Sequence, residues 1–304
     1  MRLLVRSQCE TPRLQTRHSA ALLFLGCLFV TGMGRAEDKL TAFASIAPQA
    51  YFVERVGGAF VEVGVLVGPG QNHHTFEPTP KQLSELAAAR VYFTLGLPFE
   101  KRLVEKLRAA SAQLRLVDTR EGISLRMMEA DGHGEAEHDR GPVDPHVWLS
   151  PLNAKVIAAN ICKGLQDADP AHARDYDRNL ATLQTDLDAV HARIARTLAP
   201  LKGRAFYVYH PAFGYFADVY GLKQVAVEID GKEPTARQLA DLIARAKADG
   251  VRVIFVQQQF PSKSAEAVAQ EIGGAVIPID PLSKDYPAVL EDMAAKISAA
   301  LSNP

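Results

Sequence analysis

Apolar and polar positions along this chain fall into short runs that predict strands, and a segment with helical periodicity follows each run. The order strand, then helix, begins with the strand KLTAFASI and continues to the last helix, YPAVLEDMAAKISAAL. The other predicted strands are VEVGVLV, RVYFTLG, LRLVDT, RAFYVYH, KQVAVEI, VRVIFVQ and AVIPID. This alternation is typical of parallel βα units, so the pattern predicts an α/β fold.

One segment near the middle of the chain predicts a single long helix. Residues 172–200 contain no glycine, and their only proline is the last residue. Their apolar residues recur at steps of three and four: Tyr176, Leu180, Leu183, Leu187, Val190, Ile194 and Leu198. A helix of about 25 residues spans nearly 40 Å, more than one small α/β lobe needs. We therefore predict two Rossmann-like lobes with parallel sheets, 37–171 and 201–304, joined by one rigid linker helix.

The first 36 residues follow a different pattern, that of a secretory signal peptide. A basic start precedes the apolar run AALLFLGCLFV, which is short for a permanent membrane helix. Small residues then lead to a predicted cleavage between Ala36 and Glu37. A membrane anchor, or a lipid anchor on Cys27, is the less favoured alternative, because Phe24 fits poorly and the run continues past Cys27. We expect export to the periplasm.

Composition narrows the class of protein further. With 304 residues, 47% of them hydrophobic, the chain is long enough for two domains with buried cores. A net charge of −1 gives no reason to expect a nucleic-acid partner. After removal of the signal peptide only Cys162 remains, which excludes an internal disulfide, and we interpret it as a buried apolar residue.

Residues 129–144, EADGHGEAEHDRGPVD, interrupt the alternation. They contain six carboxylates, two histidines and three glycines, with very few apolar positions. A segment of this composition has little to bury, so we interpret it as a flexible acidic loop on the surface.

Four polar residues stand where ligands bind in α/β proteins, beyond the carboxyl ends of strands. His74 follows a strand across the loop VGPGQNHHTFEPTP, His210 ends RAFYVYH, and Asp280 ends AVIPID. His146, in DPHVWLSP, precedes a helix whose positive end disfavours imidazolium and helps to keep the ring neutral.

If the lobes face one another, three imidazoles and one carboxylate could meet in the cleft between them. Such a set suits tetrahedral Zn²⁺, with bonds of about 2.0–2.2 Å, whereas Mn²⁺ favours sites richer in oxygen. A histidine at a strand end is also a common surface residue. On the residues alone, a shared metal site and four unrelated polar side chains both remain open.

Five stretches, in order, resemble the substrate-binding proteins of zinc and manganese ABC importers of the ZnuA/TroA type. They are VGPGQNHHTFEPTPKQL, DPHVWLSPLNA, KGRAFYVYHPAFGYFADVYGL, GKEPTARQLADLI and IPIDPLSKDY, and the resemblance covers nearly all of the mature chain. It implies two α/β lobes joined by a rigid helix, with the metal between them. It also implies a monomeric receptor, not an enzyme, that captures Zn²⁺ with high affinity and delivers it to a membrane permease and its ATPase. A periplasmic zinc metallochaperone is a further candidate partner.

The resemblance also implies a ligand set. His74 takes the first ligand position, although His73 replaces the proline that usually precedes it, and His146 takes the second. His210 takes a third position that is histidine in zinc-type members and glutamate in typical manganese-type members. Asp280 matches the carboxylate that completes the site, which water or another acid replaces in some members.

Several alternatives stay open at this stage. The transported ion could be Mn²⁺ or Fe²⁺, and the acidic loop, with His133 and His138, could be a weak zinc-capturing insertion or a solvated linker. A secreted zinc hydrolase is less favoured, because Asp280 would close the site and no His-Glu-x-x-His motif occurs. Nothing in the residues supports a surface adhesin directly.

Three further carboxylates, Glu77, Asp144 and Glu228, could hydrogen-bond to ligating imidazoles, but solvated charges are the default interpretation. Histidines ligate only when they are unprotonated, so we expect zinc affinity to fall below a pH of about 6.5.

Overall fold

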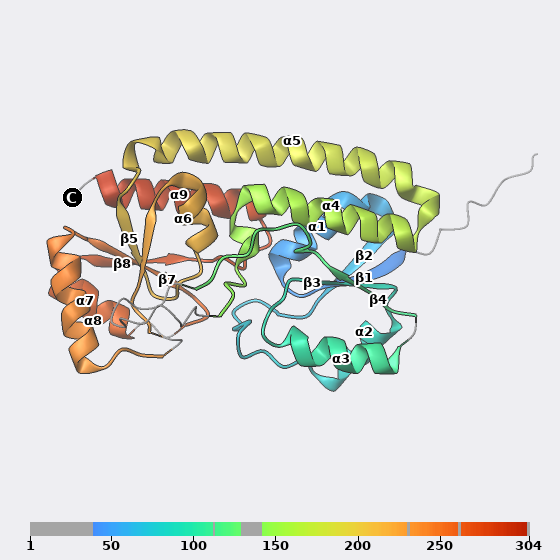
Figure 1. Ribbon diagram of the computed structural model, residues 1–304, viewed down its shortest axis with the longest axis horizontal. Coiled ribbons are helices and arrows are strands. Elements are labelled where there is room, and N and C mark those ends of the chain that lie inside the picture. Colours follow the sequence, from blue (N-terminus) through green and yellow to red (C-terminus); the bar gives the residue numbers. More distant parts are fainter. Residues whose placement is uncertain (1–38, 112, 129–141, 230–231, 261–262, 303–304) are drawn as a thin grey trace, which may run out of the picture. The chain divides into compact units, whose positions relative to one another are not determined.

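Two four-stranded parallel sheets form the framework of the part of the chain that the computed structural model describes: residues 39–111, 113–128, 142–229, 232–260 and 263–302. The strand order is β2-β1-β3-β4 in the first sheet and β6-β5-β7-β8 in the second (Figure 1). The strands are β1 (Leu40–Ala44), β2 (Val61–Val65), β3 (Val91–Thr94), β4 (Arg115–Asp118), β5 (Ala205–Val208), β6 (Lys223–Ala226), β7 (Val253–Gln257) and β8 (Ala275–Ile279). All neighbouring strands pair in parallel, which confirms the predicted fold class.

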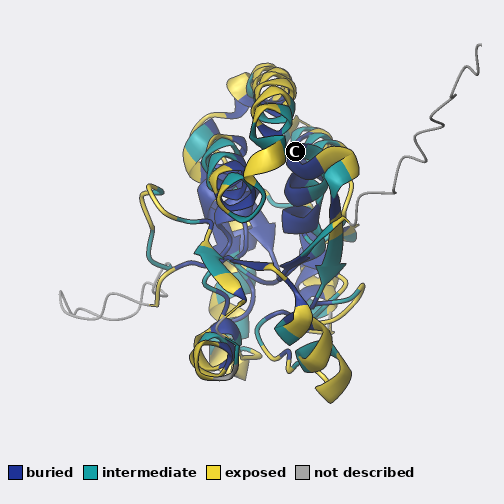
Figure 2. Cartoon of the chain, turned by 90° about the vertical axis from the view of Figure 1, so that its right-hand side faces the viewer, coloured by how far each residue is buried: buried dark blue, intermediate teal, exposed yellow. Residues whose placement is uncertain are grey.

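Helices connect successive strands, as parallel pairing requires. They are α1 (Ala47–Gly57), α2 (Pro80–Ala88), α3 (Glu100–Ala110), α4 (Pro151–Ala168), α5 (Ala173–Leu198), α6 (Gly214–Tyr220), α7 (Ala236–Ala248), α8 (Lys263–Glu271) and α9 (Tyr286–Ser302). The central strands β1, β3, β5 and β7 and the inward faces of the helices are mostly buried, while many exposed positions lie on the outer helix faces (Figure 2). Among the described residues, no helix combines the length and apolarity that crossing a membrane requires.

The start of α2 and the start of α7 are fixed by the same local device. Thr79 accepts a hydrogen bond from the backbone N–H of Gln82, whose side chain accepts one from the backbone N–H of Thr79. Thr235 and Gln238 repeat this capping box at α7. Each box satisfies two amide groups that would otherwise lack partners at the helix end.

The long helix predicted near the middle of the chain is present as α5, with 26 residues. It packs against α1 and α4 beside the first sheet and against α9 beside the second (Figure 1). Its buried side chains are Tyr176, Leu183, Leu187, Val190, Ile194 and Leu198, which follow the predicted apolar stripe. The domain boundaries at residues 171 and 200 stay a prediction.

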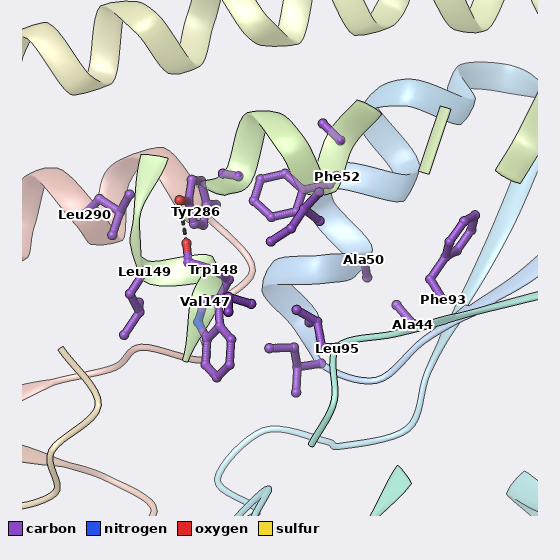
Figure 3. Close-up of a cluster of buried hydrophobic side chains, with 14 of the residues drawn as sticks. Ala44, Ala50, Phe52, Phe93, Leu95, Val147, Trp148, Leu149, Tyr286 and Leu290 are labelled. Atoms are coloured by element: carbon purple, nitrogen blue, oxygen red, sulfur yellow. Dashed lines mark hydrogen bonds between the residues drawn. The ribbon is translucent and has the colours of Figure 1, made fainter. Parts of the chain in front are cut away.

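The largest buried apolar cluster draws on both halves of the sequence. It includes Phe52 of α1, Phe93 of β3, Trp148 just before α4, and Tyr286 and Leu290 of α9 (Figure 3). A shared core of this kind opposes separation of the elements that it joins. On α4, Cys162 is free and buried, which agrees with its interpretation as an apolar residue.

Two predictions concern residues outside the described ranges. The signal peptide, residues 1–36, lies entirely outside them, and so do residues 129–141 of the predicted acidic loop. At the described end of that loop, Val143 forms an isolated antiparallel bridge with Met127.

Candidate metal centre

The adjacent histidines His73 and His74 lie in the loop between β2 and α2, beyond the carboxyl end of a strand. An Asx turn shapes the tip of this loop, because the backbone N–H of His74 donates to Asn72 Oδ1 at 2.8 Å. At its base, Leu66 and Val67 donate to the carbonyls of Ala44 and Ser45 and so extend the pairing with β1. Both imidazoles are thereby carried on the edge of the first sheet.

His146 lies in the segment that leads into the short 3-10 helix Val147–Leu149 and then α4. Contacts with the second half of the chain hold this segment. The indole N–H of Trp148 donates to the carbonyl of Pro281 at 3.0 Å, and the Tyr286 hydroxyl donates to the carbonyl of Trp148 at 2.6 Å (Figure 3). His146 is fully buried as a result.

His210 follows β5 of the second sheet and is held through its backbone. Gln257, at the end of β7, accepts from the His210 N–H at 3.2 Å and donates to the His210 carbonyl at 2.7 Å. Phe260 stacks on the imidazole, with 4.2 Å between ring centroids. The ring therefore has little freedom to turn away from the neighbouring imidazoles.

The four imidazoles converge. Nε2 of His74 lies 3.0 Å from Nε2 of His210, which lies 3.3 Å from Nε2 of His146. Nε2 of His73 lies 3.2 Å from that same atom of His146. In a tetrahedral zinc site with bonds of about 2.0–2.1 Å, two ligand nitrogens are about 3.3–3.4 Å apart. The observed separations are at or slightly below that value, so the residues fit a zinc ion geometrically.

Two buried carboxylates fix which nitrogen of His146 and His210 faces the centre. Nδ1 of His146 lies 2.8 Å from Asp144 Oδ1, and Nδ1 of His210 lies 2.6 Å from Glu228 Oε1. Because an ionised carboxylate only accepts, each Nδ1 carries the proton and each Nε2 presents a lone pair. Two lone pairs 3.3 Å apart repel each other unless a cation lies between them. A metal ion is such a cation.

Burial favours the neutral form of three of the imidazoles, those of His73, His74 and His146. Burial, together with the neighbouring histidines His146 and His210, lowers the pKa of His74 to about 2. Burial also lowers the pKa of His73 and of His146 well below the usual value. These three imidazoles therefore bind protons only weakly at neutral pH. The neutral ring is the form of histidine that ligates metals.

Asp144 illustrates competing effects on one carboxyl group. Burial raises its pKa to about 6, while the backbone N–H of His146 and the guanidinium of Arg126 act to lower it. The group remains mostly ionised at pH 7 and can accept from His146. The default interpretation of Asp144 and Glu228 as solvated charges is wrong, since both are buried, whereas Glu77 is exposed as expected.

The structure brings together three of the four predicted ligands, His74, His146 and His210. Asp280 follows β8, and its Oδ1 accepts from Gln259 Nε2 at 2.9 Å and from the backbone N–H of Leu282 at 3.1 Å. These hydrogen bonds join it to its own half of the chain. The role of all four as ligands stays a prediction.

His73 is the residue of the centre to which the sequence assigned no role. Its side chain is buried, and its Nδ1 has no hydrogen-bond partner among the described residues. One nitrogen from each of His73, His74 and His146 lies within 4.8 Å of the others. The doublet His73-His74 was the available signal, but a sequence cannot show that both rings turn inward.

The chain matches a known protein family over most of its length. A family model described as the periplasmic component A of the zinc-uptake complex, ZnuA, matches residues 43–300. The high-affinity zinc uptake system protein ZnuA of Bacillus subtilis strain 168 is 31% identical over 270 residues, which cover 83% of this chain and 82% of that protein. A crystal structure of ZnuA superposes with a TM-score of 0.80 at 40% identity, covering 86% of this chain and 99% of the other. A zinc-bound deletion mutant of ZnuA gives the same score and identity, covering 86% and 98%.

Proposed function

Because the chain belongs to the ZnuA family of periplasmic zinc-uptake components, we propose that it captures Zn²⁺ with high affinity outside the cytoplasmic membrane and delivers it to an ABC importer. The family consists of metal-binding transport receptors, not of enzymes. Zn²⁺ is accordingly the transported ligand and not a catalytic cofactor.

The observation that carries this proposal is the separation of 3.3 Å between the Nε2 atoms of His146 and His210. Asp144 and Glu228 hold the protons of these rings on the far side. His74 adds a third nitrogen, 3.0 Å from that of His210. A donor set dominated by imidazole suits Zn²⁺ better than Mn²⁺, which prefers oxygen ligands.

We assign His74, His146 and His210 as three ligands of the ion. Two candidates exist for the fourth position. Asp280 is the carboxylate that the family resemblance implies, and His73 already has its Nε2 3.2 Å from that of His146. Either would complete a four-coordinate zinc site.

The partners and the location follow from the same proposal. A receptor of this kind hands its ion to a membrane permease that an ATPase drives, and it could itself receive zinc from a periplasmic metallochaperone. The basic and apolar pattern of residues 1–36 supports export. We expect the receptor to act as a monomer.

Two measurements test the proposal. Elemental analysis of protein purified without added metal should find one zinc per chain. Isothermal titration of the chelated protein, with Zn²⁺ and Mn²⁺ in competition, should give tighter binding of Zn²⁺ at neutral pH. Tighter binding of Mn²⁺ would replace the metal assignment, and the absence of binding to either ion would refute the receptor function.

Substitutions separate the ligands. We expect His74→Ala to weaken zinc binding by more than the roughly 10–100-fold that loss of an outer-shell partner costs. His191→Ala is the matched control, because His191 lies on α5 and its Nδ1 contacts the Tyr220 hydroxyl instead of the centre. Comparison of His73→Ala with Asp280→Ala then identifies the fourth donor as the residue whose loss weakens binding more.

A further inference from the structure

We propose that Arg126 is a positioning residue for the metal centre, which it serves by fixing the orientation of Asp144 and, through Asp144, that of His146. The inference rests on the proposed zinc-binding function. Arg126 lies beyond β4 of the first sheet, and no motif in the sequence marks it.

The two oxygens of Asp144 hold different partners. Oδ1 accepts from Nδ1 of His146 at 2.8 Å and from the backbone N–H of His146 at 2.9 Å. Oδ2 faces Nη1 of Arg126 at 3.3 Å. The Asp144 side chain is fully buried and that of Arg126 is 17% exposed, so solvent screens this ion pair only weakly. The guanidinium therefore limits rotation of the carboxylate that orients His146.

The guanidinium also reaches α6, in the second half of the chain. Nε of Arg126 lies 3.1 Å from Asp218 Oδ2, and the guanidinium carbon lies 5.9 Å from the centroid of the Tyr215 ring. The Tyr215 hydroxyl accepts from the backbone N–H of Arg126 at 3.0 Å and donates to the carbonyl of Asp144 at 3.1 Å. Arg126 is therefore linked to Asp144 in two ways: directly through its side chain, and through its backbone by way of the Tyr215 hydroxyl.

Gly214, the first residue of α6, provides the space for this arrangement. A Cβ atom at Gly214 would lie 1.1 Å from Nη1 of Arg126 and 3.0 Å from Asp144 Oδ2. Any side chain at this position would therefore force the guanidinium to move. Its backbone needs no special conformation, since Gly214 is absent from the glycines with positive φ. Glycine is therefore required at position 214 because it has no side chain, and not because its backbone is flexible.

Two variants test the inference while preserving the charge of Arg126, so that altered geometry is separated from altered Coulomb attraction for the ion. Arg126→Lys keeps one positive charge but cannot contact Asp144 and Asp218 in the same fork-like manner. Gly214→Ala leaves Arg126 intact and displaces its guanidinium. Arg55→Gln is the matched control, because Arg55 forms a partly exposed ion pair with Asp186 in another part of the fold.

Zinc affinity and the visible spectrum of the Co²⁺-substituted protein are the readouts. We expect both variants to bind zinc about tenfold more weakly, near the lower end of the range for outer-shell partners, and to show a shifted Co²⁺ spectrum. The spectrum reports ligand geometry, which a loss of stability alone would leave unchanged in the folded fraction. Arg55→Gln should match the wild type in both readouts.

Wild-type affinity and an unchanged Co²⁺ spectrum in either variant would overturn the inference. If Arg126→Lys does not fold, Gly214→Ala carries the test, since alanine favours helix over glycine. Failure of the proposed function is a separate outcome, because the wild-type protein itself would then bind no zinc.

Discussion

His73 and His74 are neighbours in sequence, yet they contact different partners across the metal centre. His73 approaches His146, while His74 approaches His210 in the other half of the chain. Their ring centroids are only 4.2 Å apart. One loop therefore contributes two nitrogens to one centre, and each of these nitrogens lies against a histidine that is remote in the sequence.

At the residue scale, we predict that acid destabilises the metal-free protein. Burial lowers the pKa of His73, His74 and His146 below their unfolded value of about 6.5. Below that pH the unfolded chain binds more protons than the folded chain, so the free energy of unfolding decreases as the pH falls. Burial also raises the pKa of Asp144 to about 6 and of Glu100 to about 7, and these groups act in the opposite sense.

Because three histidines outnumber two carboxyl groups, the net effect is lower stability in acid. Urea unfolding of the chelated protein should show a lower midpoint at pH 5.5 than at pH 7.5. His74→Asn removes one contribution and should make the dependence shallower. An equal or higher midpoint at pH 5.5 would contradict this account.

At the scale of elements, the two sheets repeat one strand order, and each has a helix that begins with a Thr–Gln capping box. The box at α2 has an additional task. Gln82 Nε2 donates to the carbonyl of Leu66 at 2.7 Å and so joins the start of α2 to the base of the loop that carries His73 and His74. The local signal that starts a helix also anchors the loop.

We predict that Thr79→Ala destabilises the protein by about 1 kcal/mol, the usual cost of losing an N-cap side chain. Chemical unfolding of the metal-free protein provides the measurement. Ser84→Ala is the control: Ser84 lies within the same helix, and its exposed hydroxyl donates to the carbonyl of Pro80. Equal stability of the two variants would show that the cap contributes nothing beyond a surface hydroxyl.

At the scale of the whole molecule, contacts with the second half of the chain hold the segment around His146, although this segment belongs to the first half. Trp148 contacts Pro281 and Tyr286, and the Tyr286 ring also packs on Phe52 and Tyr51 of α1. The exposed ion pair between Lys284 and Glu54 adds little to this junction. The apolar packing is therefore the main link.

We predict that Tyr286→Phe costs about 1 kcal/mol of stability, through loss of the hydrogen bond to the Trp148 carbonyl. The same variant should release zinc faster, because His146 lies two residues away from the freed carbonyl. Tyr207→Phe is the control, since it loses a hydroxyl contact with Asp249 but lies within the second sheet. Stopped-flow release into a chelator provides the measurement, and identical rates for both variants would exclude a role for Tyr286 in holding the site.

Much of the fold could be predicted because its signals are local. The βα alternation and the apolar stripe of α5 each depend on residues a few positions apart, and the structure confirms them. The family resemblance is confirmed as well, because the family model spans residues 43–300. Asp144 and Glu228 were interpreted wrongly as solvated charges, since a charge in a sequence gives no measure of its burial.

The sequence by itself determined the apolar periodicities, the alternation of strands and helices, and the presence of histidines at strand ends. Only the tertiary structure decided which imidazoles meet, that His73 joins them, and that Asp144 and Glu228 orient two of them. The physical reason is the distance along the sequence between the residues that interact. The helices depend on hydrogen bonds between near neighbours in sequence, whereas the Nε2 contacts of the centre join histidines 64 to 136 positions apart, brought together by packing of the core.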